Sequence, residues 1–320
     1  MTNALALWIT DAQTAQIQPV AYNVGDADVE IETLFSGISR GTERLVFEGR
    51  VPVDEHETMR APFQEGTFSF PVKYGYAAVG RVLNGDRKGT MAFALFPHQS
   101  QFSVPAHMAF PVTEAVPAER AILAANMETA VNIIWDANVS VGDRVVVIGC
   151  GVVGALSAYL AAHIPGTQVT IVDIDPTRET LATRLGCDFA TPDTIAGEAD
   201  VVIHATANQA GLALAISLAG VEATIVEASW YGAAETTVPL GGKFHHRRQK
   251  LISSQVGRIP ARQAARWTFA RRLTKALSLL VDPALDALIS GETAFHEIPL
   301  HYDAILRSPD TLCHRIRYES

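Results

Sequence analysis

The sequence predicts an α/β protein with two domains, one rich in β-strands and one built on a doubly wound parallel sheet. Three observations predict this class. The chain has 320 residues, which is long for a single hydrophobic core. Residues 28–35 alternate between polar and apolar side chains, as a half-buried strand does. From residue 144 to residue 257, apolar strands alternate with helical segments, which is the order of a parallel sheet covered by helices on both faces.

Local patterns place the individual elements. Before residue 112, turn residues recur between short alternating runs, which is typical of a β-rich region. Pro176 suits the first turn of a helix and Gly186 suits its end. One long amphipathic helix is expected over residues 261–280, with Trp267, Ala270, Leu277 and Val281 on one side. The other expected elements are helices at 119–137, 152–163 and 213–220, and strands at 144–149, 168–175, 200–207, 223–230 and 311–318.

Composition excludes several classes of protein. Apolar residues make up 48% and charged residues 18% of the chain, as in folded globular proteins rather than disordered ones. The apolar runs are too short for a transmembrane helix, and the N-terminus lacks the basic start of a signal peptide. The cysteines Cys150, Cys187 and Cys313 are too far apart in sequence for a disulfide framework or a zinc ribbon. We therefore expect a cytoplasmic protein that does not act at a membrane.

The charge distribution limits the partners. A net charge of −9 argues against general affinity for nucleic acid. Nevertheless, ten of the 25 Lys and Arg residues lie between Lys243 and Val281, where there is no Asp or Glu. Two interpretations stay open for this stretch: a solvated helix face with a phosphate-facing edge, or a surface for an acidic partner.

The strongest motif is GCGVVG at residues 149–154, which directly follows an apolar strand and opens a helix. In this context a GxGxxG motif is typical of dinucleotide binding. Gly149 permits a tight turn, Gly151 lets the backbone approach a pyrophosphate, and Gly154 lets helix and sheet pack closely. Val152 and Val153 begin the helix, whose free N–H groups attract phosphates. A methyltransferase that binds adenosylmethionine also pairs a Gly-rich loop with an acidic strand end, but this spacing fits a dinucleotide better.

The carboxylate expected of such a site is Asp173, about 20 residues after the glycines, at the end of the next strand. There it would hydrogen-bond the adenosine ribose hydroxyls. Because a carboxylate repels a 2′-phosphate, the sequence favours NAD(H) over NADP(H), although Arg178 lies nearby and could receive a phosphate. Ala205, near the end of the strand at 200–207, is a further candidate cofactor contact.

This order of parts resembles the medium-chain dehydrogenase/reductase superfamily, which includes alcohol dehydrogenases. SGISRGTE (36–43) is similar to the family's Gly-Ile-Cys-Gly-Thr-Asp segment, and VKYGYAAVGRV (72–82) is similar to its Gly-His-Glu-x-x-Gly-x-Val segment. Residues 36–52 look most like the bacteriochlorophyllide dehydrogenase branch, which does not make that pigment the substrate. The resemblance implies a homodimer or homotetramer. It also implies a GroES-like catalytic domain at 1–122, a Rossmann domain at 123–257 and a return segment at 258–320 that completes the catalytic domain.

The zinc ligands of that family are missing from this chain. Tyr76 and Ala77 stand where the zinc enzymes have His and Glu. The family's zinc cysteine falls at Ser39 or Arg40, and its third ligand falls at Ala125. Zinc needs thiolate, imidazole or carboxylate ligands. The lobe of four cysteines that binds the structural zinc is absent too, so we expect no metal.

Without zinc, hydrogen-bond donors must stabilise charge on the substrate oxygen. Tyr76, in a former ligand position, is predicted to be the oxyanion donor or general acid, or else a plug for the vacated cavity. Thr42 is similar to the family's hydroxyl that passes protons out through the cofactor ribose, or is a helix cap. Ser39 either lines the same cleft or completes a turn, and His98 either shuttles protons or is exposed in its loop. A weaker alternative keeps a metal on Tyr76, Glu65 and His98.

Thr129 and Glu128 open a helix that in the family runs past the nicotinamide. Thr129 is a candidate cofactor contact, and Glu128 is either a contact or a charge on the helix surface. The sequence therefore predicts a zinc-independent NAD(P)(H)-dependent oxidoreductase. It would transfer hydride between nicotinamide and a small-molecule substrate, which is an alcohol, a ketone or a conjugated carbonyl. The alternative is a non-catalytic NAD(H)-binding protein of the same fold, acting as a sensor or partner-binding module.

Overall fold

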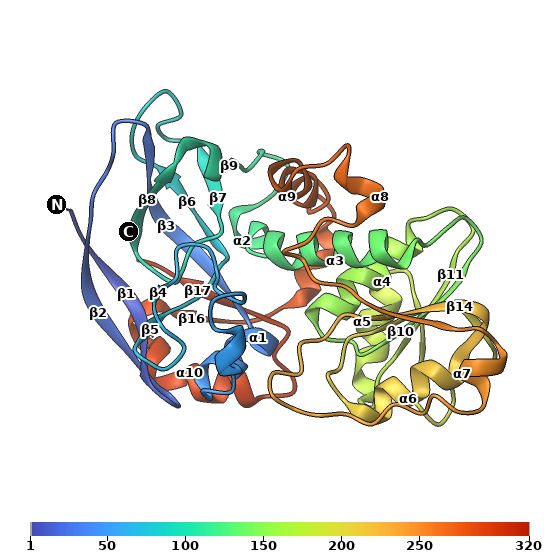
Figure 1. Cartoon of the computed structure of the whole chain (residues 1–320). Coiled ribbons are helices and arrows are strands. Elements are labelled where there is room, and N and C mark those ends of the chain that lie inside the picture. The colour runs from blue at the N-terminus through green and yellow to red at the C-terminus, as the bar shows by residue number, and fades with distance from the viewer. Residues whose placement is uncertain (1, 320) are drawn as a thin grey trace. The chain divides into compact units, whose positions relative to one another are not determined.

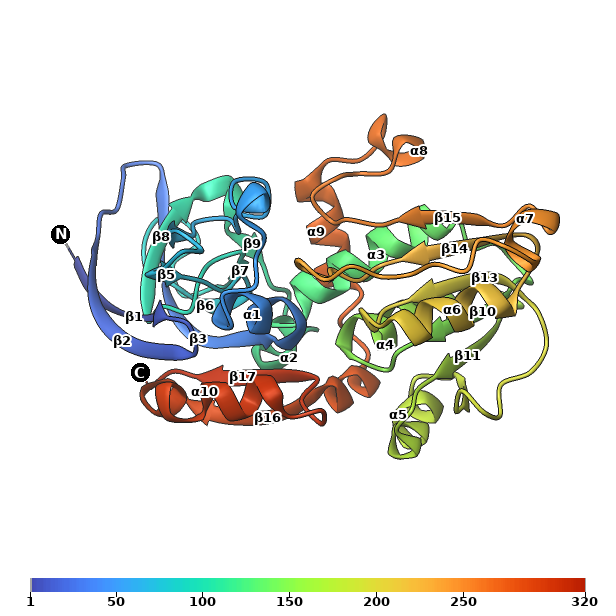
Figure 2. The same cartoon turned by 60° about the horizontal axis from the view of Figure 1, so that its bottom comes forward.

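The computed structural model describes residues 2–319, and the chain divides into two compact units (Figures 1 and 2). The first unit combines the N-terminal part of the chain, as far as Ala125, with the C-terminal part from Leu273 on. The second unit is Asn126–Arg272. Within residues 2–319, every helix is too short or too polar to cross a lipid bilayer.

The first unit is built on two β-sheets. The larger has seven strands in the order β16-β17-β3-β6-β7-β9, with β8 paired to β3, and the smaller has the order β2-β1-β5-β4. In β3 (Asp28–Ser39) buried and half-buried residues alternate over most of its length, which confirms the period-two prediction. The other strands are β1 (Thr2–Asp11), β2 (Thr14–Tyr22), β4 (Glu65–Gly66), β5 (Val72–Lys73), β6 (Ala78–Val82), β7 (Met91–Ala94), β8 (Gln101–Pro105), β9 (Phe110–Pro111), β16 (Ile289–Ala294) and β17 (Cys313–Arg317).

The C-terminal segment joins this unit through β17. It pairs antiparallel with β3, so that Cys313 faces Ser39 and Ile316 faces Ser36. The end of the chain therefore lies beside the strand that leads into α1 (Arg40–Phe47). The remaining helical segments of the unit are α2 (Ala118–Ala121), α10 (Ile298–Arg307) and the 3₁₀ turns η1 (Val53–Glu55), η2 (Ala106–Met108), η4 (Pro283–Leu288) and η5 (Phe295–Glu297).

The second unit is a six-stranded parallel sheet in the order β12-β11-β10-β13-β14-β15. The direction of winding changes between β10 and β13, and ligands of such sheets bind outside the carboxyl ends of the strands at this point. Its strands are β10 (Arg144–Ile148), β11 (Gln168–Val172), β12 (Asp188–Ala190), β13 (Ala199–His204), β14 (Ala219–Glu227) and β15 (Lys250–Ser253). Its helical segments are α4 (Val152–Ala162), η3 (Pro176–Arg178), α5 (Glu179–Arg184), α6 (Gln209–Leu218), α7 (Lys243–His246) and α8 (Ala261–Ala264). Two further helices, α3 (Ala124–Ala137) and α9 (Phe269–Ser278), lie mostly in one unit each but begin or end at its boundary.

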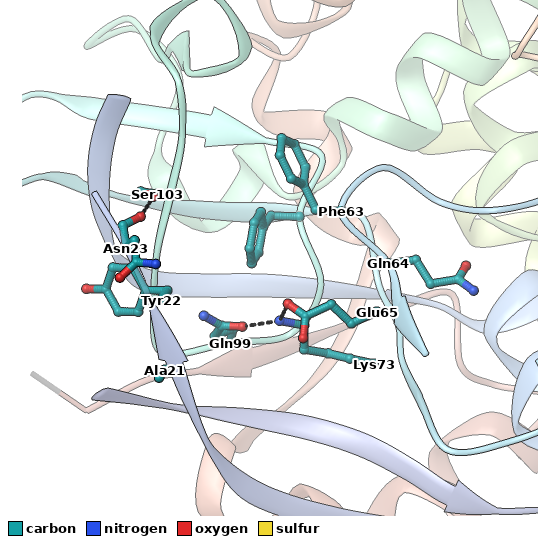
Figure 3. Close-up of a pocket in the computed structure, with 10 residues that line it drawn as sticks. Ala21, Tyr22, Asn23, Phe63, Gln64, Glu65, Lys73, Gln99 and Ser103 are labelled. Carbon is teal, nitrogen blue, oxygen red and sulfur yellow. Dashed lines mark hydrogen bonds and ion pairs between the residues drawn. The ribbon is translucent and has the colours of Figure 1, made fainter. Parts of the chain in front are cut away.

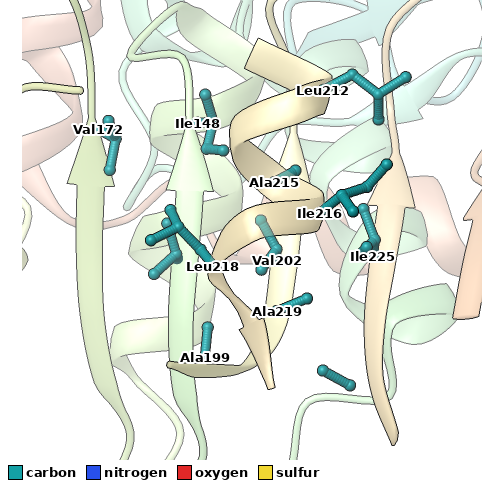
Figure 4. Close-up of a cluster of buried hydrophobic side chains, with 12 residues drawn as sticks. Ile148, Val172, Ala199, Val202, Leu212, Ala215, Ile216, Leu218, Ala219 and Ile225 are labelled. Atoms are coloured by element: carbon teal, nitrogen blue, oxygen red, sulfur yellow. The ribbon is translucent and has the colours of Figure 1, made fainter. Parts of the chain in front are cut away.

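The core of this sheet is visible in Figure 4, where α6 lies against the strands. Leu212 and Ile216 of α6 are buried with Val202 and Ile225 of the strands. The strands carry little except branched apolar residues because a parallel sheet is covered on both faces. The helix–sheet alternation predicted from the sequence is therefore confirmed.

Several sequence predictions differ from the structure. The single helix predicted at 119–137 forms two, α2 and α3. Residues 261–280 form two helices, α8 and α9, because the Thr268 hydroxyl accepts the Arg271 N–H and caps a new helix start. Val281, predicted on the apolar side, is 50% exposed. Residues 258–272, assigned above to the return segment, belong to the second unit, where Arg272 is buried in contact with Glu128 of α3.

Candidate active site

A buried carboxylate organises the point where β3 ends and α1 begins. Glu43 lies in the first turns of α1 and has no exposed surface. Its Oε1 accepts the backbone N–H of Ser39 at 2.7 Å, and its Oε2 accepts the hydroxyl of Tyr302 at 2.7 Å. The carboxylate thus satisfies a free N–H at the helix start, a place that favours negative charge. Thr42, offered above as the helix cap, lies inside α1, and the residue at the cap position is Ser39.

His98 completes the surroundings of this carboxylate. Its Nε2 lies 3.0 Å from Glu43 Oε2, and its Nδ1 lies 2.8 Å from the hydroxyl of Ser36. The imidazole is fully buried, so the prediction of an exposed loop histidine is wrong. Two backbone hydrogen bonds hold the residue in the core. The His98 carbonyl accepts the N–H of Leu7, and the His98 N–H donates to the Tyr74 carbonyl.

The glycine in the KYGYAAVG stretch is explained by the same histidine. Gly75 has a φ of 118°, and a Cβ added to it would lie 2.9 Å from the imidazole of His98. A larger residue would therefore be strained in its backbone and would collide with the ring. Farther along, a Cβ at Gly80 would lie 2.1 Å from the Glu32 carbonyl oxygen of the paired strand β3. Both glycines of the stretch are required by close contacts.

Tyr76 lies beside this cluster, with its hydroxyl bonded to the side chains of Ser39 and Thr42. Burial and, to a smaller extent, the charge of Glu43 raise the pKa of the phenol to about 12, although the two hydrogen bonds act in the opposite direction. The phenol is therefore protonated at neutral pH and can donate a hydrogen bond. Its ring lies edge-on to that of Tyr74, with 6.0 Å between the ring centres. Three of the four candidate catalytic residues, Tyr76, Ser39 and Thr42, thus come together, and His98 joins them through Glu43.

The former zinc positions do not fit the metal. Zinc is bound by thiolate, imidazole or carboxylate groups. A protonated phenol, a serine and an alanine supply none of these. Among residues 2–319, no three His, Cys, Asp or Glu side chains gather as they would around a metal ion. The predicted lack of zinc nevertheless stays a prediction.

The alternative metal site on Tyr76, Glu65 and His98 does not form, because Glu65 is engaged elsewhere. Figure 3 shows the ammonium group of buried Lys73 between Glu65 and Gln99, at 2.5 and 2.6 Å from their side-chain oxygens. These residues line a cavity of about 380 Å³. Burial lowers the pKa of Lys73, and the bond to Glu65 partly offsets this.

The glycine turn of the second unit has the shape that a dinucleotide needs. Gly149 has a φ of 104°, and a Cβ there would lie 2.7 Å from the Thr206 side chain. A Cβ at Gly154 would lie 2.0 Å from the Gly149 carbonyl oxygen. These two glycines are therefore required by the turn and by the packing of α4 on it.

Gly151 is different, because nothing in the chain requires it. Its φ of −73° suits any residue, and an added Cβ would meet no atom within 4 Å. It caps the amino end of α4 without a side-chain partner for the free N–H groups of that helix. Open space therefore lies beside the first residues of α4, Val152 and Val153. A helix start of this kind binds an anionic group of a ligand. An interpretation of the motif as packing alone explains Gly149 and Gly154 but not Gly151.

Asp173 lies directly against this turn. It follows β11, and its two carboxylate oxygens accept the N–H groups of Cys150 at 2.7 Å and Asp175 at 3.0 Å. Arg178 is held beside Asp175, at 3.5 Å. Ala205 is half-buried after β13, and a Cβ at Gly154 would lie 3.4 Å from its methyl group. The carboxylate and Ala205 therefore both lie at the glycine turn.

On α3, Thr129 is half-buried and Glu128 is buried. Glu128 pairs with Arg272 at 3.0 Å, so its interpretation as a surface charge is wrong. Burial raises the pKa of Glu128, while the guanidinium acts in the opposite direction. Arg272 also donates to Asn132 and to the Val256 carbonyl, which ties α3 to the segment before α9.

Comparison with known proteins was made by sequence and by structure. No family model matches the chain. Over 183 residues it is 28% identical to D-guloside 3-dehydrogenase of Escherichia coli strain K12, a match that covers 53% of this chain and 52% of that protein. The chain thus spans about half the length of the curated relative that it matches.

Solved structures cover nearly the whole chain. A protein of Sinorhizobium meliloti 1021 solved with NADP superposes with a TM-score of 0.78 at 15% identity over 99% of this chain and 100% of that one. An alcohol dehydrogenase of Escherichia coli CFT073, solved with NADH, gives the same TM-score, identity and coverage. This chain shares their fold. As predicted, the first unit is GroES-like and the second unit has a Rossmann fold.

Proposed function

We propose that this protein is a zinc-independent, NAD(H)-dependent oxidoreductase that acts on an alcohol, a ketone or a conjugated carbonyl. The observation that carries the proposal is the open space at Gly151, at the start of α4 and beside Asp173. The names of its relatives support dehydrogenase activity. Because one of them is D-guloside 3-dehydrogenase, sugar-like alcohols are the first class of substrate to screen. The local similarity to bacteriochlorophyllide dehydrogenases stays a prediction.

The cofactor would be held by groups of the second unit. The N–H groups of Gly151, Val152 and Val153 would bind the pyrophosphate, since a helix start carries partial positive charge. Asp173 would accept hydrogen bonds from the adenosine ribose hydroxyls. Its carboxylate favours NAD(H), because a 2′-phosphate at the same place would meet like charge. Thr129 and Ala205 are proposed as further contacts.

The first unit would supply the proton chemistry. When bound, the nicotinamide ring gives or takes the hydride. Tyr76 donates a hydrogen bond to the substrate oxygen and stabilises the negative charge that develops there. Ser39 and Thr42 hold its hydroxyl in place, and Glu43 disfavours its ionisation, so that Tyr76 keeps its proton until the substrate takes it.

Fluorescence titration with NADH and NADPH tests the cofactor. We expect micromolar affinity for NADH, at least tenfold tighter than for NADPH. Gly151→Ala should fold with unchanged thermal stability, because its Cβ meets nothing in the chain, yet lose at least tenfold in NADH affinity. The matched control is Gly241→Ala, which adds the same methyl group at another open position and should bind normally. No binding to the parent protein, or normal binding by Gly151→Ala, would contradict the proposal.

Two further measurements test the chemistry. Elemental analysis after dialysis should find less than stoichiometric zinc, and one zinc per chain would overturn zinc independence. Tyr76→Phe should bind NADH normally but reduce carbonyl substrates at least a hundredfold more slowly. NADH binding without turnover of any alcohol or carbonyl would instead favour the non-catalytic alternative.

A further inference from the structure

Four side chains form a continuous chain of hydrogen bonds through the first unit. The hydroxyls of Tyr318 and Ser36 lie 3.0 Å apart, and Ser36 Oγ lies 2.8 Å from His98 Nδ1. On the other side of the ring, His98 Nε2 lies 3.0 Å from Glu43 Oε2. Each distance is that of a normal hydrogen bond. We name Tyr318, Ser36, His98 and Glu43 the polar chain.

The polar chain is unusual because it runs through the core. Ser36, His98 and Glu43 have no exposed surface, and Tyr318 is 6% exposed. Burying polar and charged groups is costly, and well-packed apolar residues could fill such a place at lower cost. Ser36, His98 and Glu43 each have at least two hydrogen-bond partners, so the buried part of the polar chain is satisfied.

The outer end of the polar chain reaches the surface. Tyr318 lines an open surface cavity of about 520 Å³, together with Glu32, Gln101 and Glu319. A path for protons would require water in that cavity to reach the Tyr318 hydroxyl. Acidic side chains at its rim would raise the local concentration of protons.

The inner end lies at the candidate active site. Glu43 Oε1 accepts the N–H of Ser39 at 2.7 Å, and the side chain of Ser39 is bonded to the hydroxyl of Tyr76. Glu43 and Tyr76 thus both contact Ser39, Glu43 through its backbone N–H and Tyr76 through its side chain. The polar chain therefore joins the neighbourhood of Tyr76 to a surface cavity within one unit of the protein.

We propose that the polar chain carries protons between Tyr76 and the surface cavity. The inference rests on the proposed function of Tyr76. A proton moves from the Tyr318 hydroxyl to Ser36 Oγ and from Ser36 to His98 Nδ1, while His98 Nε2 releases one to Glu43. Glu43 then restores the proton of Tyr76 through the Ser39 hydroxyl. Each step breaks one O–H or N–H bond and forms another, and Tyr318 regains its proton from water. His98 is left with its ring proton on Nδ1, so a return of that proton to Nε2 resets the ring before the next transfer.

Histidine is the residue that makes such a transfer feasible. A neutral imidazole accepts a proton at one nitrogen and releases one from the other, near neutral pH. A purely structural role would require only that the polar groups be paired. The two interpretations differ in whether protons move along the polar chain.

The exchange of the His98 ring proton with water distinguishes them. Histidine labelled with ¹⁵N allows that exchange rate to be measured by NMR in the whole protein, with the signal assigned by its loss in His98→Gln. We expect Ser36→Ala and Tyr318→Phe each to slow the exchange at least tenfold, because they interrupt the path to the cavity. Tyr302→Phe is the matched control: it removes a hydrogen bond of similar length to Glu43 but leaves the path intact, so the rate should not change.

Unchanged exchange in Ser36→Ala and Tyr318→Phe would overturn the proposal, and Tyr318→Phe removes only one oxygen, so it should fold normally. Because this measurement needs no turnover, its outcome is independent of whether the oxidoreductase activity is found. If carbonyl reduction is observed, the same two variants should lower kcat about tenfold and increase the solvent deuterium isotope effect, whereas Tyr302→Phe should not increase it. A loss of kcat with an unchanged isotope effect would also count against proton transfer.

Discussion

His98 Nε2 lies 3.0 Å from Glu43 Oε2, and neither residue has any exposed surface. The two residues are 55 positions apart in the sequence. Burying a carboxylate is costly unless hydrogen bonds compensate. Glu43 also accepts hydrogen bonds from the Ser39 N–H and the Tyr302 hydroxyl. The loop that carries His98, the strand β3 and the helix α10 are thereby fixed around one negative charge. Tyr76 lies close enough for its pKa to respond to that charge.

Glu43 should therefore matter to folding. Glu43→Ala leaves His98 and Tyr302 without their buried acceptor, and breaking a buried pair in this way costs about 3–5 kcal/mol in the free energy of unfolding. Urea denaturation measures it. The control is Asp303→Ala, which breaks the exposed Asp303–Arg307 pair of the same unit and should cost about 0–1 kcal/mol. Equal costs for the two variants would contradict the role given to Glu43.

The cofactor turn could be predicted from the sequence because its signal is local. Gly149, Gly151 and Gly154 stand between an apolar strand and a helix, and Asp173 follows at the expected distance. The backbone alone makes that site, and a short segment specifies its conformation. The structure adds only that Gly151, unlike Gly149 and Gly154, has no reason within the chain to be glycine.

The polar chain could not be predicted in the same way. Ser36, His98 and Tyr318 come from three distant segments, which are brought together because β17 and β8 both pair with β3. FPHQSQF reads as a polar surface loop, and only the contacts of His98 with Leu7 and Tyr74 bury it. Single-sequence patterns carry no information on such long-range contacts. Of the four residues, only Glu43 lies in a recognisable motif, SGISRGTE.

Gly154 should be sensitive to the smallest substitution. In Gly154→Ala the new methyl group would lie 2.0 Å from the Gly149 carbonyl oxygen, so α4 must move away from the turn. Such overpacking typically costs about 1–3 kcal/mol. Thermal unfolding should show the loss, with Gly151→Ala, whose methyl group meets nothing, as the stable control. Equal stability of the two variants would mean that α4 is not packed on the turn as described.

Asp173 should determine the choice of cofactor. Asp173→Asn removes the charge that opposes a 2′-phosphate, so the ratio of NADH to NADPH affinity should fall at least tenfold. Asp175→Asn, two residues along, is the control, because Asp175 caps the 3₁₀ turn that follows it and is paired with Arg178. Dissociation constants from fluorescence titration give both ratios. A similar fall in both variants would indicate a general effect of charge rather than a specific contact.

The three cysteines should be unreactive towards thiol reagents in the folded protein. Cys150, Cys187 and Cys313 are buried, and burial raises the pKa of each thiol to about 12. Compared with an ordinary thiol, the thiolate fraction at pH 8 falls by about three orders of magnitude. A disulfide reagent at pH 8 should therefore label none of the three within minutes, and all of them in urea. Rapid labelling without denaturant would show that a thiol is exposed.

The same shift gives the stability of the protein a pH dependence with a definite sign. The unfolded chain releases the Cys313 proton near pH 9, whereas the folded protein keeps it to about pH 12. The unfolded state thus binds fewer protons in this window, and the free energy of unfolding should fall as pH rises from 9 towards 12, by up to about 1.4 kcal/mol per pH unit for each thiol. Below pH 9 the stabilisation is fully present. Buried tyrosines such as Tyr76 change the free energy of unfolding with the same sign at higher pH. The contribution of Cys313 is therefore measured between pH 9 and 10, as the difference between the parent protein and Cys313→Ala in the slope of the free energy of unfolding against pH. A parallel slope in that variant would show that Cys313 titrates alike in the folded and unfolded states.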